Sequence, residues 1–184
     1  MELLIIGLSV FFLIHLLPTT PTLKSTLIGK LGEIPYKALF SVVSLAGFSL
    51  IVYGKVQAEF IHVWQPPVML AVLTKLLMLP AMILLVAAYL PSNIKKHIRH
   101  PMLSGVSLWA AGHLMVNGDM ASILLFGGFL VFAVVDMASA NARGAARQVE
   151  TKPLWNDILV LILGGGAYAL LGIFHQRLFG VSIV

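Results

Sequence analysis

The chain has 184 residues, of which 59% are hydrophobic and 10% are charged, and its mean hydropathy is +0.99. This composition leaves little chain for a soluble part, and the length is typical of one domain, residues 1–184. The formal net charge is +5, but the basic residues lie between apolar runs and do not indicate nucleic-acid binding. The absence of cysteine excludes disulfides, thiolate haem ligation, cysteine-bound iron–sulfur clusters and covalent c-type haem.

Apolar runs recur from end to end, and crossing a bilayer takes roughly 20 such residues. Because the runs are continuous and show no strand alternation, they favour helices over a β-barrel. The sequence therefore predicts an all-α integral membrane bundle of six transmembrane helices, at residues 2–17, 38–54, 67–90, 102–116, 120–139 and 157–176. The first and fourth are short for a full span. The first also carries Glu2 in place of a basic n-region, so we expect a retained helix rather than a cleaved signal.

Basic residues alternate between the connections. Loops 18–37, 91–101 and 140–156 each carry three, whereas 55–66 carries only Lys55 and 117–119 carries none. The positive-inside rule places the three basic loops in the cytoplasm and predicts that both termini are non-cytoplasmic. The nine basic residues are Lys24, Lys30, Lys37, Lys95, Lys96, Arg99, Arg143, Arg147 and Lys152.

The first basic loop has a helical pattern of its own. Leucines at 23, 27 and 31 alternate with lysines, which predicts a short helix in the membrane interface. Gly32 is expected to end it, and Pro35 fits the first turn of the next helix.

Later in the chain, Asn117 to Asp119 predicts a tight outer turn with Asp119 as the N-cap of the following helix. The runs 102–116 and 120–139 should therefore form an antiparallel hairpin. In the last run, Gly164 to Gly166 and the pair Gly165 and Ala169 predict close packing against another helix.

Three histidines lie inside or at the start of apolar runs: His15, His100 and His113. A titratable ring in lipid is costly, so such a residue is a functional candidate by default. Imidazole is also the commonest protein ligand of transition metals and of haem iron. These three are the candidate metal ligands, and the alternative for each is a hydrogen bond to a neighbouring helix.

Predicted depth limits which histidines can share one iron. His15 and His100 both lie at the inner side, whereas His113 is about 13 residues further along its helix, or roughly 20 Å. His62 and His175 lie at the outer side with His113. A bis-histidine haem would then pair His15 with His100, or His113 with either His62 or His175.

The inner pair has basic neighbours. Haem propionates are anions, and Lys95, Lys96 and Arg99 precede a helix whose first N–H groups are free. Lys96 and Arg99 are therefore predicted to contact the cofactor. His97, in the same loop, is expected to face water.

Two further charges fall within apolar runs. Lys75 is expected to snorkel to the interface, and Asp136 to pair with Arg143. The alternative is that they couple transport to protons. No nucleophile–base–orienter set, P-loop or carboxylate pair supports a soluble-enzyme mechanism.

Several stretches resemble the NnrU family of bacterial inner-membrane proteins. They are Gly7 to Pro18, Gly32 to Tyr36, Ala87 to Pro91, Arg99 to Gly105 and Leu108 to Asp119. The resemblance implies a single NnrU-like transmembrane domain in the inner membrane. It also implies a role in denitrification, in the expression or activity of nitrite and nitric oxide reductases.

The NnrU family is also similar to the plant 15-cis-zeta-carotene isomerase, a membrane enzyme that uses haem b with histidine ligands. That similarity implies haem b here, redox or isomerase-like chemistry, and His15, His100, His113 and His62 as candidate ligand positions. The implied partners are membrane lipid, reductase components or a small hydrophobic substrate.

The stretch Arg99 to Gly105 is also similar to the RHPxYxG signature of membrane methyltransferases of the isoprenylcysteine carboxyl type, which bind S-adenosylmethionine. Leu103 stands at the tyrosine position, and after the run 120–139 the only acidic residues are Glu150 and Asp157. Two alternatives to a haem protein therefore stay open: an S-adenosylmethionine-dependent methyltransferase, and a non-catalytic assembly or transport factor.

Overall fold

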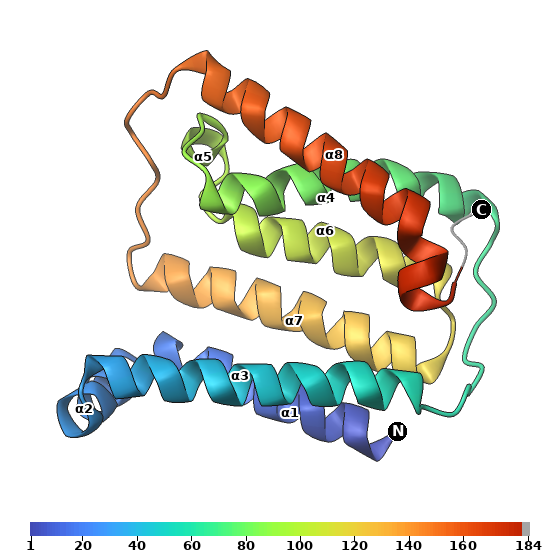
Figure 1. The fold of residues 1–184 in the computed structure, drawn as a ribbon, viewed down its shortest axis with the longest axis horizontal. Coiled ribbons are helices and arrows are strands. Elements are labelled where there is room, and N and C mark those ends of the chain that lie inside the picture. The colour runs from blue at the N-terminus through green and yellow to red at the C-terminus, as the bar shows by residue number, and fades with distance from the viewer. Residues whose placement is uncertain (182–184) are drawn as a thin grey trace. The chain divides into compact units, whose positions relative to one another are not determined.

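The computed structural model describes residues 1–181, and its regular elements there are all helices, apart from one β-bridge between His62 and Asp119. Figure 1 shows their order. They are α1 (Glu2–Leu16), the 3-10 turn η1 (Leu17–Thr19), α2 (Pro21–Leu31), α3 (Glu33–Val56), α4 (Met69–Tyr89), α5 (Ile94–His97), α6 (Pro101–Val116), α7 (Met120–Ala142) and α8 (Leu154–Phe179). The all-α class is as predicted.

Five helices in the described part are long and apolar enough to cross a membrane by length and composition. They are α1 with the turn that follows it (Glu2–Thr19), α3, α4, α7 and α8. The prediction of six spans is thus supported for five. The remaining one, α6, has 16 residues, or about 24 Å, which is shorter than the roughly 30 Å of bilayer hydrocarbon.

The surface of these helices is apolar. Large hydrophobic side chains on them expose well over half of their area, among them Leu13, Val42, Leu45, Leu76, Ile162 and Ile173. A water-soluble monomer rarely exposes so much contiguous apolar surface, and lipid is the solvent that suits it. The structure is therefore that of a multi-pass membrane protein.

Helix boundaries differ from the predicted ones where local bonds extend a helix. The span predicted from residue 38 starts earlier in the structure, because α3 begins at Glu33, directly after Gly32 with its positive φ of 87°. Pro35 lies in its first turn, and an ion pair between Glu33 and Lys37 spans one turn at 2.7 Å. The short helix predicted before it is confirmed as α2.

The chain forms two compact units by its contacts. Unit 1 contains Met1–Trp64 and Gly118–Gly128, and unit 2 contains Gln65–Asn117 and the chain from Phe129 onward. Helix α7 contributes its first turns to unit 1 and its remainder to unit 2.

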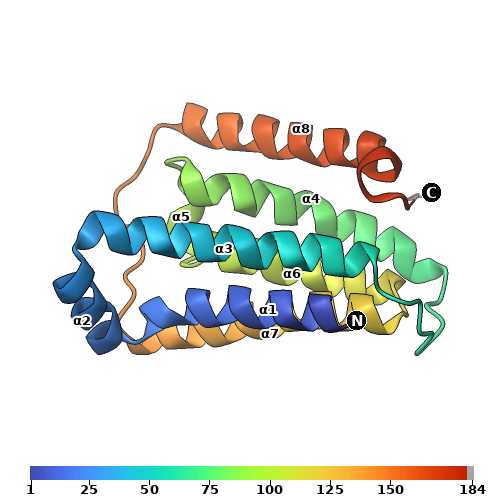
Figure 2. The same cartoon turned by 60° about the horizontal axis from the view of Figure 1, so that its bottom comes forward.

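In unit 1, α1 and α3 lie side by side and antiparallel, with α2 at one end (Figure 2). Glycines allow the two backbones to approach. A Cβ added at Gly7 would lie 2.6 Å from the Ile51 nitrogen, and one added at Gly47 would lie 2.9 Å from the Phe11 nitrogen. Because the contacts advance along one helix as they recede along the other, the pair is antiparallel.

In unit 1, the connection after α3 and the start of α7 are joined around Asp119. Its carboxylate accepts hydrogen bonds from Lys55 Nζ at 3.0 Å and from the Ser122 backbone N–H at 2.9 Å, so the predicted N-cap is confirmed. Lys55 also donates to the Ser122 hydroxyl at 2.8 Å. Burial raises the pKa of Asp119, but the hydrogen bonds from Ser122 and Lys55 outweigh burial and hold the pKa below its ordinary value.

Unit 2 packs α6 and α8 against α4. The Thr74 hydroxyl donates to the Gly112 carbonyl oxygen at 2.9 Å, and a Cβ added at Gly164 would lie 2.7 Å from the Ile83 Cα. The close approach in α8 is therefore at Gly164, and the predicted contact at Gly165 is wrong, because nothing lies within 4 Å of a Cβ there.

The predicted hairpin is also present in unit 2. Arg99 and His100, directly before α6, contact Asn141 in the last turn of α7. Ser104, one turn into α6, contacts Met137, one turn earlier in α7. This progression makes α6 and the unit 2 part of α7 antiparallel, as predicted.

The connections before α6 and before α8 are bound together. The Asn93 side chain exchanges two hydrogen bonds with the backbone of Lys152, at 2.8 Å each, and donates to Asp157 at 2.6 Å. Gln148 donates to the Ser92 carbonyl oxygen at 3.0 Å. These bonds fix the two basic loops of unit 2 at the same end of the unit.

Candidate functional site

Unit 2 brings two of the predicted histidines together. His113, near the end of α6, and His175, near the end of α8, have ring centroids 6.5 Å apart and an interplanar angle of 26°. Two imidazoles that bind one metal ion from opposite sides have centroids roughly 6 Å apart, because each metal–nitrogen bond is about 2 Å. The separation therefore suits a pair of ligands to one ion.

Backbone carbonyls fix which nitrogen of each ring carries the proton. His113 Nδ1 lies 2.8 Å from the Trp109 carbonyl oxygen, and His175 Nδ1 lies 2.7 Å from the Val181 carbonyl oxygen. Since a carbonyl only accepts, each Nδ1 is the donor, and the lone pair of the neutral ring is on Nε2. Metal-binding histidines commonly have this tautomer and this kind of supporting bond.

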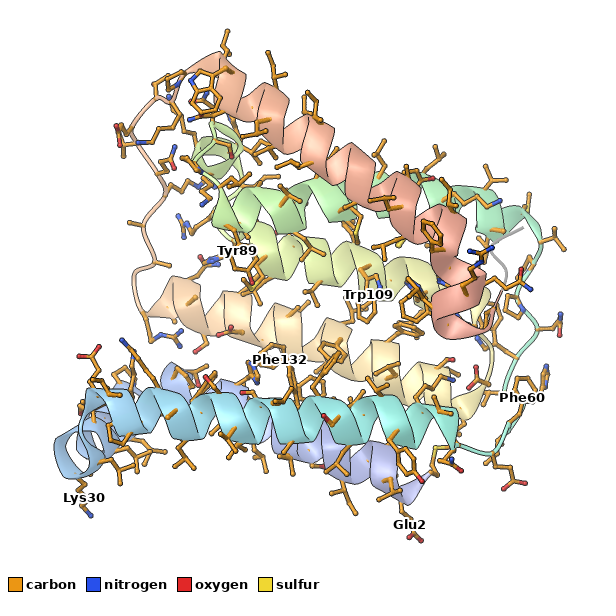
Figure 3. The ribbon with its side chains drawn as sticks, in the orientation of Figure 1. Glu2, Lys30, Phe60, Tyr89, Trp109 and Phe132 are labelled. Atoms are coloured by element: carbon orange, nitrogen blue, oxygen red, sulfur yellow. The ribbon has the colours of Figure 1, made fainter. Side chains whose placement is uncertain are left out.

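Aromatic rings surround the pair. Trp109, labelled on α6 in Figure 3, lies with its ring 5.2 Å from the His113 ring and 5.7 Å from Phe129 of α7. Phe179 lies 4.9 Å from the His175 ring. The pair thus lies next to aromatic rings of both helices.

His15 lies in unit 1 and has the same backbone support. Its Nδ1 is 2.7 Å from the Phe11 carbonyl oxygen, one helical turn earlier, as His113 is to Trp109. Its ring stacks on Phe11 at 4.0 Å and meets the edge of Phe40 at 5.1 Å. His15 is therefore held as an Nδ1–H tautomer in the last turn of α1.

His100, in unit 2, is the N-cap of α6. Its Nε2 lies 3.0 Å from the Asn141 side-chain oxygen, which also accepts a bond from Arg99 at 2.6 Å. Lys96 donates to the Thr151 hydroxyl at 2.7 Å. Lys96, Arg99 and His100 were all predicted at the inner cofactor site. Each contacts a neutral side chain, Thr151 before α8 or Asn141 at the end of α7.

The other histidines face outward. His62 is exposed in unit 1, in the bridge to Asp119, and His97 is exposed as predicted. Among residues 1–181, no group of three or more His, Asp or Glu side chains is placed to hold a metal ion. The predicted pair of Asp136 and Arg143 is confirmed at 3.8 Å, and Lys75 is exposed on α4.

A model of the family described as NnrU protein matches residues 3–183, nearly the whole chain. The chain belongs to the NnrU family. No curated protein and no solved structure matches it. In this NnrU family member, the last two stretches of the resemblance, Arg99 to Gly105 and Leu108 to Asp119, form α6 with both of its ends.

Three features of the NnrU family member were not predicted. The first is the ion pair of Lys55 with Asp119, and the second is the set of hydrogen bonds from Asn93 to Lys152 and Asp157. The third is that His113 lies beside His175. The sequence predicted part of this, because the residues of each contact were predicted to lie on the same side of the membrane. Which of the residues on one side contact each other depends on the rotation of each helix about its axis. The side of the membrane alone does not determine that rotation.

Proposed function

We propose that this NnrU family member is a multi-pass protein of the bacterial inner membrane that serves the nitrite and nitric oxide reductases of denitrification and binds haem b through histidine. The observation that carries the proposal is the near-parallel pair of His113 and His175, with both Nδ1 atoms held by carbonyl oxygens. The family membership supports the link to denitrification.

The residues fit a haem of the b type. The chain has no cysteine, which excludes a thiolate ligand, and the Nε2 lone pairs of His113 and His175 would supply two ligands to the iron. The predicted inner pair, His15 and His100, stays the alternative, with Lys96 and Arg99 as partners for the propionates. When bound, haem supplies a redox-active iron whose potential the axial ligands and the surrounding burial set.

We also propose six membrane crossings, with both termini outside the cytoplasm. Lys55 follows the end of α3, and Asp119 precedes α7, yet they form an ion pair 3.0 Å long. Both must lie on the same side of the membrane, so the chain between them crosses an even number of times. Since α4 crosses once, α6 must cross as well, and its 16 residues call for a thinned bilayer or an upright helix.

The test of the haem proposal is the absorption spectrum of the detergent-purified protein, oxidised and dithionite-reduced, with a pyridine haemochrome assay. We expect a stoichiometric Soret band with sharp reduced α and β bands, which indicate six-coordinate haem b. His113→Ala and His175→Ala should each shift or abolish these bands, because each removes one axial ligand.

His62→Ala and His97→Ala are the matched controls, because both residues are exposed histidines, and they should leave the bands unchanged. Loss of the bands in His15→Ala and His100→Ala alone would assign the inner pair instead. A protein that is colourless even after haem reconstitution would refute the haem proposal. The methyltransferase and assembly-factor hypotheses would then lead, and calorimetry with S-adenosylmethionine would separate those two.

A further inference from the structure

Unit 1 contains a hollow where α1 passes through η1 and α2 into α3. It measures about 360 Å³, and its lining residues are Pro18, Lys24, Tyr36, Lys37, Phe40 and Ser41. All six lie within 24 residues of the chain, at the turn between two helices that are long enough to span a membrane. The hollow therefore lies where the two spans end, at the level of the lipid headgroups.

Two lysines line this hollow from different helices. Lys37 of α3 is paired with Glu33 at 2.7 Å, and both side chains are well exposed. Lys24 of α2 takes part in none of the ion pairs formed by residues 1–181. The lining contains no carboxylate. The charge balance of the lining is thus positive and suits an anion.

Tyr36 supplies a polar group that the chain leaves without a partner. The residue is only 7% exposed, and its hydroxyl has no hydrogen-bond partner among the described residues. The hydroxyl oxygen is itself buried, so an acceptor in the hollow would reach it only after a shift of the atoms that cover it, and the new bond would then recover the roughly 1–3 kcal/mol that such a group costs. Phe40 and Pro18 make the remaining wall apolar. The hollow therefore combines donors for an anion with a surface for a hydrocarbon chain.

The surroundings indicate where such a ligand comes from. Leu23, Leu31 and Ile34 are exposed beside the hollow by 46%, 44% and 81%, which suits a segment lying in the membrane interface. Lys30 of α2 is labelled at this end of unit 1 in Figure 3, whereas Glu2 and Phe60 are labelled at the opposite end. Anionic phospholipids are enriched in the cytoplasmic leaflet, and each nearby lysine attracts them by about 1 kcal/mol.

We propose that this hollow is a binding site for one anionic phospholipid. Lys24 and Lys37 would hold the headgroup phosphate, the Tyr36 hydroxyl would donate to a phosphate oxygen, and Phe40 would contact the upper part of an acyl chain. The site is independent of the histidine pair and of any haem.

The test is lipid-dependent thermal stabilisation of the delipidated full chain in detergent, titrated with phosphatidylglycerol. We expect the melting temperature to rise with phosphatidylglycerol and to rise much less with phosphatidylcholine, which has no net charge. Lys24→Gln should raise the lipid concentration for half of the effect about fivefold, and Tyr36→Phe about tenfold. Native mass spectrometry should show the matching loss of one retained lipid.

Each variant has a control on the same helix. Lys30→Gln removes the same charge from α2 outside the lining, and Tyr53→Phe removes an exposed hydroxyl from α3. Both should titrate like the wild type. Tyr36→Phe should melt no lower than the wild type without lipid, because it removes a hydroxyl that has no partner in the chain. That measurement separates loss of binding from loss of folding.

Three results would overturn the proposal. The first is an equal effect of Lys24→Gln and Lys30→Gln, which would indicate general attraction to the surface. The second is equal stabilisation by phosphatidylcholine. The third is full stabilisation by inorganic phosphate alone, which would assign the hollow to a soluble anion rather than to a lipid.

Discussion

Asp119 makes both a local and a long-range contact in unit 1. It caps α7 through the Ser122 N–H, and it binds Lys55, which is 64 positions away in the chain. Its side chain is 10% exposed, whereas that of Lys55 is 34% exposed, so water screens part of the attraction. The contribution of this ion pair to stability should therefore be modest, up to about 1 kcal/mol.

The pH dependence of Asp119 follows from the direction of its pKa. Because the folded pKa is lowered below the ordinary value of 3.8, the carboxylate stabilises the fold above that value, and this stabilisation is lost as pH falls through the folded pKa. Asp119→Asn keeps a good N-cap but removes the charge. We expect it to melt below the wild type at pH 7 and to converge with it below about pH 4. Melting curves in detergent from pH 7 to pH 3 measure this.

Glu150→Gln is the control for Asp119→Asn, because Glu150 is 73% exposed in its pair with Lys152. It should melt close to the wild type at every pH. An Asp119→Asn protein that differs from the wild type by the same amount at pH 3 as at pH 7 would contradict the role given to the Asp119 charge.

At the scale of elements, the packing of α1 on α3 depends on glycine. Gly7, Gly47 and Gly54 are where the two helices touch, and the atoms nearest to an added Cβ are backbone atoms of the other helix. A flexible side chain could move away, but a backbone cannot move without displacing its helix. Close backbone contact through small residues is how helices associate in lipid, where the hydrophobic effect between them is absent.

Gly7→Ala should therefore destabilise the protein, by about 1–3 kcal/mol, since the new methyl group forces α1 away from α3. Gly165→Ala is its matched control, because both glycines lie inside long helices and nothing lies within 4 Å of a Cβ at 165. Alanine is the better helix former by up to about 1 kcal/mol, so the control should be neutral or stabilising. Melting temperatures in detergent compare the two, and a Gly7→Ala protein as stable as the control would contradict this packing.

At the scale of the whole molecule, non-local bonds constrain membrane topology. The ion pair of Lys55 with Asp119 holds the connections after α3 and before α7 on one side. The hydrogen bonds from Asn93 to Lys152 and Asp157 hold the connections before α6 and before α8 on one side as well. Each bond requires an even number of crossings in between, which supports the crossing of α6 despite its length.

Single-cysteine labelling tests this topology, and the chain suits it because it has no native cysteine. Glu59→Cys should react with a membrane-impermeant maleimide on intact cells, whereas Ser25→Cys and Arg147→Cys should react only after lysis. If α6 does not cross, Arg147→Cys becomes reactive on intact cells while the other two are unchanged. Reaction of Ser25→Cys from outside would instead reverse the orientation inferred from the basic loops.

The sequence by itself determined the helices, their order and several of their ends. Apolar runs marked the six longest helices, Gly32 and Pro35 marked the passage from α2 to α3, and Asp119 marked the start of α7. The ion pair of Asp136 with Arg143 also followed from the sequence. All of these depend on residues within a few positions of one another, so the pattern of the chain is enough to predict them.

Only the tertiary structure decided which distant residues meet. It selected His175 as the neighbour of His113, Gly164 as the contact of α8 with α4, and Lys55 as the partner of Asp119. Each choice depends on the rotation of a helix about its axis, and a helix that is apolar on every face shows no preferred rotation in its sequence. Glycine contacts and buried polar bonds set that rotation, and they exist only once the helices are packed.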